Sequence, residues 1–459
     1  MTDFENLPTN DDPARVTLAQ DEPESRVGGL PLYVWVIVAV ALAIPTGVVW
    51  GEGATQLELM PKLILRALTA LAAPLVVFAI LSAIVTNEVR GRLGALMMVF
   101  YMINTLVAML IGLTLTNLVR PGTGAALIES GAAAIPLAKK TASELLLDLV
   151  PRSIGEPFTQ NHLAQLVLLT LALGIGLVKI RDGQKARGET SFGVVVDLLT
   201  IGFELLMKVL LWVVALVPLA VFGIVASSVG QKEGLAVLGS LIWLIVVVVA
   251  GLSIQVLWYL AQMALVAGMS PWRFLRGSLN VMASTFSTAS TAATIPITLK
   301  SLERLGISRR SSQLTACIGT NFNNDGTALY MATAVLFMAQ SLGYQLSILD
   351  QVLIVLTTLV ASVGAGGIPS GSFVTMPLIF AAVKLPAEKI PILLTVDWLL
   401  DRCRTTSNVL GDMTVAVLLD RVSPPAPVAE STGRQAAPRE IDAPTAESPL
   451  KSETGPQIW

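Results

Sequence analysis

Residues 397–412, DWLLDRCRTTSNVLGD, place three aspartates and two arginines inside an otherwise apolar stretch that runs from about residue 390 to residue 419. An ionisable side chain at the centre of a bilayer costs roughly 2.5–3.5 kcal/mol on insertion scales. A cluster of such side chains on a spanning segment is therefore expected to line a site rather than to face lipid. The segment predicts a membrane protein of the transporter class.

The polar residues of this segment recur at intervals of three or four. A helix therefore presents them on one face: Asp397, Asp401, Arg404, Asn408 and Asp412. Arg402 falls on a different face. One interpretation of the stripe is an internal salt bridge between Asp401 and Arg404. The other is a substrate site, because a guanidinium suits a carboxylate and an aspartate suits an ammonium group, so an acidic amino acid would satisfy both.

The composition agrees with a bilayer setting. Of 459 residues, 54% are hydrophobic and 14% are charged, with a mean hydropathy of +0.72. This is far more apolar than an ordinary soluble domain. The net charge of -2 argues against a nucleic-acid surface. Cys317 and Cys403 are expected to be free thiols, His162 an interfacial residue, and the lack of a cysteine or histidine cluster argues against a transition metal.

Six apolar runs reach the roughly 20 residues needed to cross a bilayer. They lie near 31–50, 57–86, 93–119, 160–180, 192–229 and 234–268. They predict six conventional spans within residues 30–268. Residues 1–29 and 422–459 lack an apolar face and are expected to be disordered tails. The basic residues concentrate in alternate loops, which favours a cytoplasmic N-terminus. We expect a multi-pass protein of the plasma (inner) membrane with both termini cytoplasmic.

Residues 269–421 differ, because their apolar runs are interrupted near 289–296, 321–327 and 364–372. Unwound backbone at bilayer depth is tolerated only where it faces protein or water. The first and third interruptions predict re-entrant hairpins whose helix N-termini favour an anion, although the first also suits a helix face with back-bonded hydroxyls. The middle one, TNFNNDGTALY from residue 320, predicts a site for a hard monovalent cation or, alternatively, an amide-lined kink.

Three segments resemble motifs of the dicarboxylate/amino acid:cation symporter family, which includes archaeal aspartate transporters and excitatory amino acid transporters. They are NNDGTALY (323–330), SVGAGGIP (362–369) and residues 397–412. The resemblance covers about residues 30–422. It implies an all-α polytopic homotrimer with eight transmembrane helices and two re-entrant helical hairpins. Most of residues 30–268 would form a scaffold, while the third and sixth spans and residues 269–421 would form an elevator-type transport domain.

The resemblance also implies site residues. Arg404 would bind the side-chain carboxylate of the substrate and Asp401 its amino group. The remaining pocket residues would be Thr405, Asn408, Thr327, Thr291 and the backbone near Ile368. One cation site would use Asp412 with carbonyls of Gly319, Asn323 and Asn408. A second would use carbonyls of Asn321, Ser362, Val363 and Ala365, and a third would use Asp325, Asn323, Tyr101 and Thr105.

Some positions depart from the family pattern. Asn324 stands where the family has methionine, and Asn104 where it has threonine, which leaves the identity and number of the cations open. Ala292 removes a hydroxyl from a usual serine triplet. Arg402 follows the animal-like pattern, in which this arginine lies on the last span. Met331 replaces a glutamate used for proton and potassium coupling in animal members, so that coupling does not extend to this chain.

These observations predict a secondary-active symporter of aspartate or glutamate, driven by sodium ions or alternatively by protons, with no organic cofactor and no enzymatic activity. The runner-up is a proton- or sodium-coupled symporter of C4-dicarboxylates. It is disfavoured because Asp401 would repel an acidic ligand that has no amine. An anion channel and a membrane-embedded enzyme are further alternatives, but no nucleophile–base pair is recognisable near Asp325 or Asp401.

Overall fold

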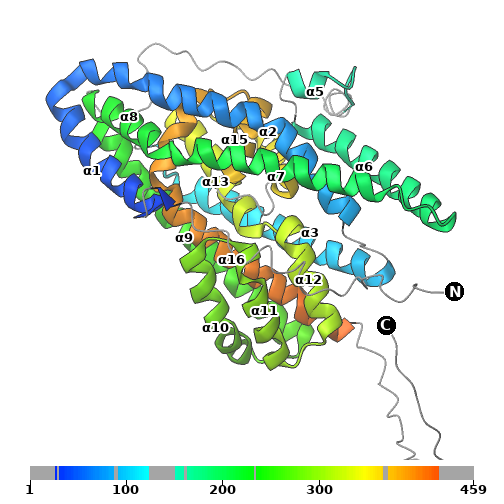
Figure 1. Ribbon diagram of the computed structural model, residues 1–459. Helices are drawn as coiled ribbons and strands as arrows, with labels where there is room; N and C mark the ends of the chain where they lie inside the picture. The colour runs from blue at the N-terminus through cyan, green and yellow to red at the C-terminus, as the bar shows by residue number, and fades with distance from the viewer. Residues whose placement is uncertain are drawn as a thin grey trace, which may run out of the picture. The chain divides into compact units, whose positions relative to one another are not determined.

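Figure 1 shows the computed structural model of the chain. It describes residues 26–27, 30–86, 91–123, 150–159, 163–231, 234–364 and 371–422. These residues are almost entirely helical. Their only strands are β1 (Arg26–Val27) and β2 (Leu30–Pro31), which pair antiparallel just before the first helix. The predicted all-α class is confirmed for the described residues.

The helices follow one another closely along the chain. The first group is α1 (Leu32–Trp50), the 3₁₀ helix η3 (Gly51–Glu58), α2 (Leu59–Thr86), α3 (Gly91–Val119), α5 (Glu156–Thr159), α6 (Leu163–Ala186), α7 (Gly193–Ala215), α8 (Val217–Gly230), α9 (Gly234–Gln262) and the π-helix η4 (Met263–Ala267). The second group is α10 (Pro271–Thr288), α11 (Thr291–Leu305), α12 (Arg309–Phe322), α13 (Asp325–Ser341), α14 (Ile348–Gly364), α15 (Gly371–Ala382), η5 (Ala387–Leu393) and α16 (Leu394–Val422).

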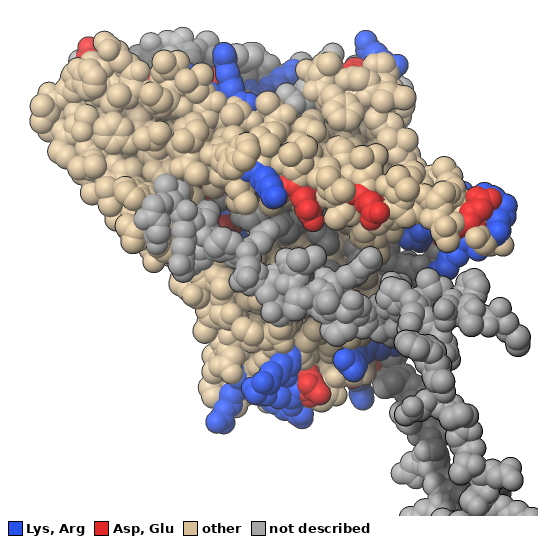
Figure 2. Space-filling view, in the orientation of Figure 1, with Lys and Arg blue, Asp and Glu red and all other residues tan. Residues whose placement is uncertain are grey.

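Four helical stretches among the described residues are long and apolar enough to cross a membrane: Leu32–Thr86, Arg92–Val119, Gly193–Gly230 and Leu238–Ala267. The first includes α1, η3 and α2, and the chain turns from α1 into η3 at Gly51, whose positive φ of 59° suits a sharp turn. Large apolar side chains stay exposed on these helices, and Trp212 of α7 is 70% exposed. Figure 2 shows a surface that is mostly free of charge over these helices. The chain is therefore an integral membrane protein.

Two predicted spans are not single α-helices. The apolar run 192–229 divides at Leu216 into α7 and α8, because Pro218 in the first turn of α8 has no N–H to continue the preceding helix. The last span begins as the 3₁₀ helix η5, which contains Pro391, and becomes α-helical only from Leu394. Apolar length alone does not reveal such changes of helix type.

The first interruption is shorter than expected. Only Ala289 and Ser290 separate α10 from α11, and Pro296 lies within α11. Ala289 takes a left-handed conformation with a φ of 52°, and the Ser290 hydroxyl accepts a hydrogen bond from the Ala293 N–H at 3.2 Å. Thr285 donates to the carbonyl four residues earlier, so back-bonded hydroxyls are present as well. The break is a helix end followed by a capped helix start.

The second interruption falls at Asn323 and Asn324, between α12 and α13, and both side chains are buried. The third falls at residues 365–370, which lie outside the described residues. Helix α16 packs against α3, α9, α10, α12 and α13, so the charged last helix is enclosed by broken helices and by two earlier spans (Figure 1). This packing buries most of α16 from Arg404 to Leu419.

Candidate functional site

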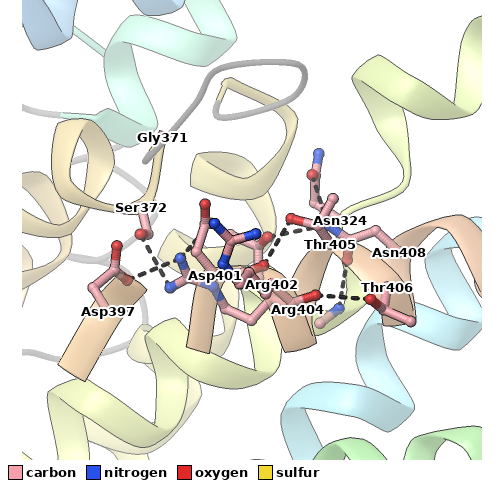
Figure 3. A network of polar contacts seen from close by, with 12 residues as sticks. Asn324, Gly371, Ser372, Asp397, Asp401, Arg402, Arg404, Thr405, Thr406 and Asn408 are labelled. Atoms are coloured by element: carbon pink, nitrogen blue, oxygen red, sulfur yellow. Dashed lines mark hydrogen bonds and ion pairs between the residues drawn. The ribbon is translucent and has the colours of Figure 1, made fainter. Parts of the chain in front are cut away.

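Arg404 is the centre of a charged cluster on α16 (Figure 3). Its side chain is 1% exposed. Nη2 lies 2.9 Å from Asp397 Oδ1 and 2.6 Å from Asp401 Oδ1, while Nη1 donates to Ser372 Oγ at 3.2 Å. The guanidinium carbon also lies 4.1 Å from the centre of the Tyr330 ring. Asp397 and Asp401 of the stripe predicted from the sequence therefore meet on one buried cation.

The internal salt bridge between Asp401 and Arg404 is present, as one of the two interpretations requires. This salt bridge does not account for all the charged and polar groups of the cluster. Two carboxylates face one guanidinium, and Arg404 Nε has no hydrogen-bond partner among the described residues. The Asp401 side chain is 23% exposed, whereas that of Asp397 is 6% exposed. The site thus offers one arginine that can still donate and one carboxylate that is accessible enough to change partners.

Asn408 connects this cluster to the break between α12 and α13. Its Oδ1 accepts from the Gly326 N–H at 2.8 Å, and its Nδ2 donates to Thr327 Oγ1 at 3.2 Å. Thr405 donates to the Asp401 carbonyl at 2.7 Å. Thr291 is the first residue of α11, and no hydrogen bond joins it to Arg404 in the described part of the chain. Ile368 lies outside the described residues.

A second polar cluster surrounds the carboxylates of Asp325 and Asp412. Thr105 on α3 donates to Asp325 Oδ1 at 2.6 Å, and Tyr259 on α9 donates to Asp325 Oδ2 at 2.7 Å. Asn323 Nδ2 donates to the Asn408 carbonyl at 2.8 Å and to Asp412 Oδ1 at 2.9 Å. Both hydrogen bonds fix the amide, and they leave the buried Asn323 Oδ1 without a partner among the described residues. A buried orphan oxygen beside two carboxylates suits a cation.

Two glycines allow the helices to approach closely here. A Cβ on Gly319 of α12 would lie 2.6 Å from the Tyr101 hydroxyl and 2.5 Å from Asp412 Cγ. A Cβ on Gly411 of α16 would lie 2.6 Å from Asn323 Nδ2. Real Cβ atoms do not come so close. The residues expected for the first and third cation sites are therefore brought into one region, with Tyr101 donating to the Thr315 carbonyl at 3.3 Å.

The residues expected for the second cation site are only partly described. The Ser362 carbonyl, in the last turn of α14, accepts from Asn324 Nδ2 at 2.9 Å. Asn321 and Val363 lie in α12 and α14, and only their backbone is described. Ala365 lies outside the described residues. The one contact that is described joins the end of α14 to the break between α12 and α13.

The ligand chemistry of these clusters is that of oxygen atoms. Within the described ranges, no group of three or more histidine, cysteine or acidic side chains could hold a metal ion. Carboxylate, hydroxyl, amide and carbonyl oxygens suit hard cations such as sodium rather than soft transition metals. Cys403 is a free cysteine beside the charged cluster and is half-buried.

Several functional contacts were not predicted from the sequence. Ser372 and Tyr330 contact Arg404, and Tyr259 contacts Asp325. Ser372 stands in the first turn after a glycine- and proline-rich break, which is a usable signal for ligand contact. Tyr259 lies in an ordinary apolar span and offers no signal. Asn104 turns to α9, where its Oδ1 accepts from Gln262 at 2.6 Å, and no hydrogen bond joins it to Asp325 in the described part of the chain.

Arg402 points away from the stripe, as its position predicts. Its Nη1 donates to the carbonyls of Phe286 and Ser287 in the last turn of α10. Its guanidinium carbon lies 4.9 Å from the centre of the Tyr33 ring. A cation at the C-terminal carbonyls of a helix is favourable, so Arg402 stabilises the end of α10 beside the first break.

A helical membrane protein that holds a buried charged centre on broken helices has the layout of a secondary transporter. The sequence profile of the sodium:dicarboxylate symporter family matches residues 32–422, and the chain belongs to this family. It is 29% identical to an excitatory amino acid transporter of Caenorhabditis elegans, over 85% of this chain and 89% of that protein.

Two other relatives carry different names. The chain is 29% identical to C4-dicarboxylate transport protein 1 of Bradyrhizobium, over 84% of this chain and 89% of that protein. It is 31% identical to neutral amino acid transporter B(0) of Bos taurus, over 86% of this chain and 80% of that protein. Because these three names refer to different substrate classes at similar identity, the side chains around Arg404 must guide the choice of substrate.

Proposed function

We propose that this protein is a sodium-coupled symporter of aspartate or glutamate. The observation that carries the proposal is the buried Arg404 with Asp401 as its accessible partner. A guanidinium buried at bilayer depth is costly unless a carboxylate neutralises it. In this structure Asp397 and Asp401 of the protein itself supply that carboxylate.

Binding of an acidic amino acid would exchange these partners. The side-chain carboxylate of the substrate replaces Asp401 on Arg404, where Nε is free to donate. Asp401 then turns to the ammonium group of the substrate. Each charge keeps a partner throughout, which lowers the cost of bringing a charged ligand into a buried site. Asp397 stays on Arg404 and holds the guanidinium in place.

The further pocket and ion roles remain part of the proposal. Thr405, Asn408, Thr327, Thr291 and the backbone near Ile368 complete the substrate pocket. Sodium is held by Asp412 with carbonyls of Gly319, Asn323 and Asn408, and by Asp325 with Asn323, Tyr101 and Thr105. The carbonyls of Asn321, Ser362, Val363 and Ala365 are the remaining candidate ligands, and Asn324 Nδ2 already donates to the Ser362 carbonyl. The Asn323 Oδ1 atom has no partner among the described residues, and a buried oxygen needs a donor or a cation. This atom therefore supports the site of Asp325, Tyr101 and Thr105 most directly.

The proposal extends to a homotrimer in which eight transmembrane helices and two re-entrant hairpins are divided between a scaffold and an elevator-type transport domain. Support comes from α7, where Asp197, Glu204 and Lys208 are exposed on a membrane helix. Figure 2 shows charged side chains crossing the apolar surface where α7 lies. Such groups are costly in lipid, so contact with another copy is favoured. Cross-linking in membranes that yields only monomers would contradict the trimer.

The same proposal places the protein in the plasma (inner) membrane with both termini cytoplasmic. Lys and Arg side chains gather at the end of the bundle where α10, α11 and α12 lie, as Figure 2 shows. Basic loops stay on the cytoplasmic side. This distribution supports the predicted orientation of the connections near Arg273, Arg304 and Arg309.

Uptake into proteoliposomes with imposed gradients tests the function as a whole. An inward sodium gradient should drive accumulation of labelled aspartate or glutamate above its external concentration, and collapse of the gradient should abolish it. Accumulation driven by a proton gradient alone would replace sodium by protons as the coupling ion. Current without accumulation would indicate an anion channel, and chemical conversion of the substrate would indicate an enzyme.

C4-dicarboxylate symport is the second candidate, because a relative of similar identity carries that name. Asp401→Asn separates the two. The change removes the charge assigned to the ammonium group at nearly constant volume, so binding of aspartate should weaken by about tenfold to a hundredfold, the value of a charge-assisted hydrogen bond. Competition by succinate should change far less. Equal losses for both ligands would instead show that Asp401 serves only its salt bridge with Arg404.

A further inference from the structure

Asn324 is a buried amide at the break between α12 and α13, and its side chain is 5% exposed. Its Nδ2 donates to the Ser362 carbonyl at 2.9 Å, and its Oδ1 accepts from Asn408 Nδ2 at 3.4 Å. The side chain thereby joins three helical segments: the start of α13, the end of α14 and the middle of α16.

The orientation of this amide follows from its neighbours. Asn408 Oδ1 accepts from the Gly326 N–H at 2.8 Å, which directs Asn408 Nδ2 toward Asn324 and Thr327. Asn324 must therefore present its oxygen to Asn408 and its NH₂ group to Ser362. A reversed Asn324 amide would set two NH₂ groups against each other and two carbonyl oxygens against each other. The donor at the Ser362 carbonyl is thus imposed by a chain of hydrogen bonds.

The Ser362 carbonyl belongs to the last turn of α14, whose final residue is Gly364. The last four carbonyls of an α-helix have no donor within the helix. Such a carbonyl at bilayer depth requires either a cation or another donor. Here the Asn324 NH₂ group supplies the donor, and its hydrogens carry partial positive charge toward the position that a cation on this carbonyl would occupy.

We propose that the Asn324 amide takes the place of one coupling cation. A neutral hydrogen bond of the protein itself joins the end of α14 to the break between α12 and α13. Substrate binding is therefore linked to two cations, one fewer than the three sets of candidate ligands would bind. This inference rests on the proposed sodium symport and specifies its stoichiometry. Asn324 then sets the number of cations coupled to each substrate, while Asp325 and Asp412 bind the remaining cations.

The test measures substrate affinity of the purified protein by calorimetry at a series of sodium concentrations. Below saturation, the slope of log Ka, the logarithm of the substrate association constant 1/Kd, against log sodium concentration gives the number of linked ions. Asn324→Met removes the donor and should steepen this slope by about one, so that a tenfold rise in sodium strengthens binding by about a further tenfold. The control is Asn117→Leu, which removes a hydrogen bond from α3 to Gln351 at the opposite end of α14 and should leave the slope unchanged.

A slope that is above zero and equal in the wild type and Asn324→Met would overturn the inference and leave sodium symport intact. A slope of zero in both proteins would overturn the sodium symport and the inference together. Because the methionine variant could fail to fold, the wild type provides a second measurement. Reversal potentials of uptake in proteoliposomes should correspond to about two sodium ions per substrate, and a value of three would contradict the replacement.

Discussion

Arg404→Cys is expected to abolish uptake of acidic amino acids and to create uptake of small neutral ones. The guanidinium is almost fully buried and is the only cation that the described structure places against Asp397 and Asp401. Losing the buried partner of a substrate carboxylate costs about 2–5 kcal/mol, which is about 30-fold to several-thousandfold in affinity. Cysteine is small and uncharged, so a neutral side chain fits the space that the arginine leaves.

The measurement is uptake of labelled aspartate, serine and alanine into the same proteoliposomes. Arg402→Cys is the matched control, because it removes an arginine from the same helix on the face that contacts α10 and Tyr33. That variant should transport more slowly or be less stable, but it should keep its preference for acidic substrates. If Arg404→Cys still takes up aspartate and gains no neutral substrate, the assigned role of Arg404 is wrong.

Asp412→Asn is expected to remove most of the linkage between sodium and substrate. Asp412 is buried, and the Asn323 amide is its hydrogen-bond donor at 2.9 Å. A bound cation offsets the cost of an ionised carboxylate in the membrane. In the wild type, sodium at about one hundred times its Kd should stabilise the fold by about 2.7 kcal/mol and raise the melting temperature by a few degrees. By reciprocity, substrate and sodium should each strengthen the binding of the other by the same factor.

The asparagine variant should fold, since the change preserves shape, but sodium should scarcely raise its melting temperature. Asp420→Asn provides the control, because it makes the same change on the same helix, where Asp420 Oδ1 accepts from the Ser308 N–H at 3.1 Å. That variant should retain the full sodium effect. A sodium shift of equal size in Asp412→Asn and the wild type would exclude Asp412 as a cation ligand.

Local patterns along the chain were sufficient for the membrane class, the family and the stripe on α16. Apolar length predicts a span, and the spacing of Asp397, Asp401 and Arg404 places them on one face, because both depend only on the geometry of a single helix. The same local geometry separated Arg402 from the stripe. The break at Asn323 was also visible, since polar residues rarely interrupt an apolar helix without a reason.

The partners of those groups depend on the tertiary structure. Thr105 and Asp325 form a hydrogen bond although 220 positions separate them in the chain, and Tyr259 reaches the same carboxylate from an apolar span. Ser362 and Asn324 are joined only because α14 ends beside the break. Helical periodicity specifies which face a side chain occupies, but it carries no information on which distant face packs against it. The sequence by itself therefore determined the polar groups of the site, and the packing of α3, α9, α13 and α14 around α16 decided how they are paired.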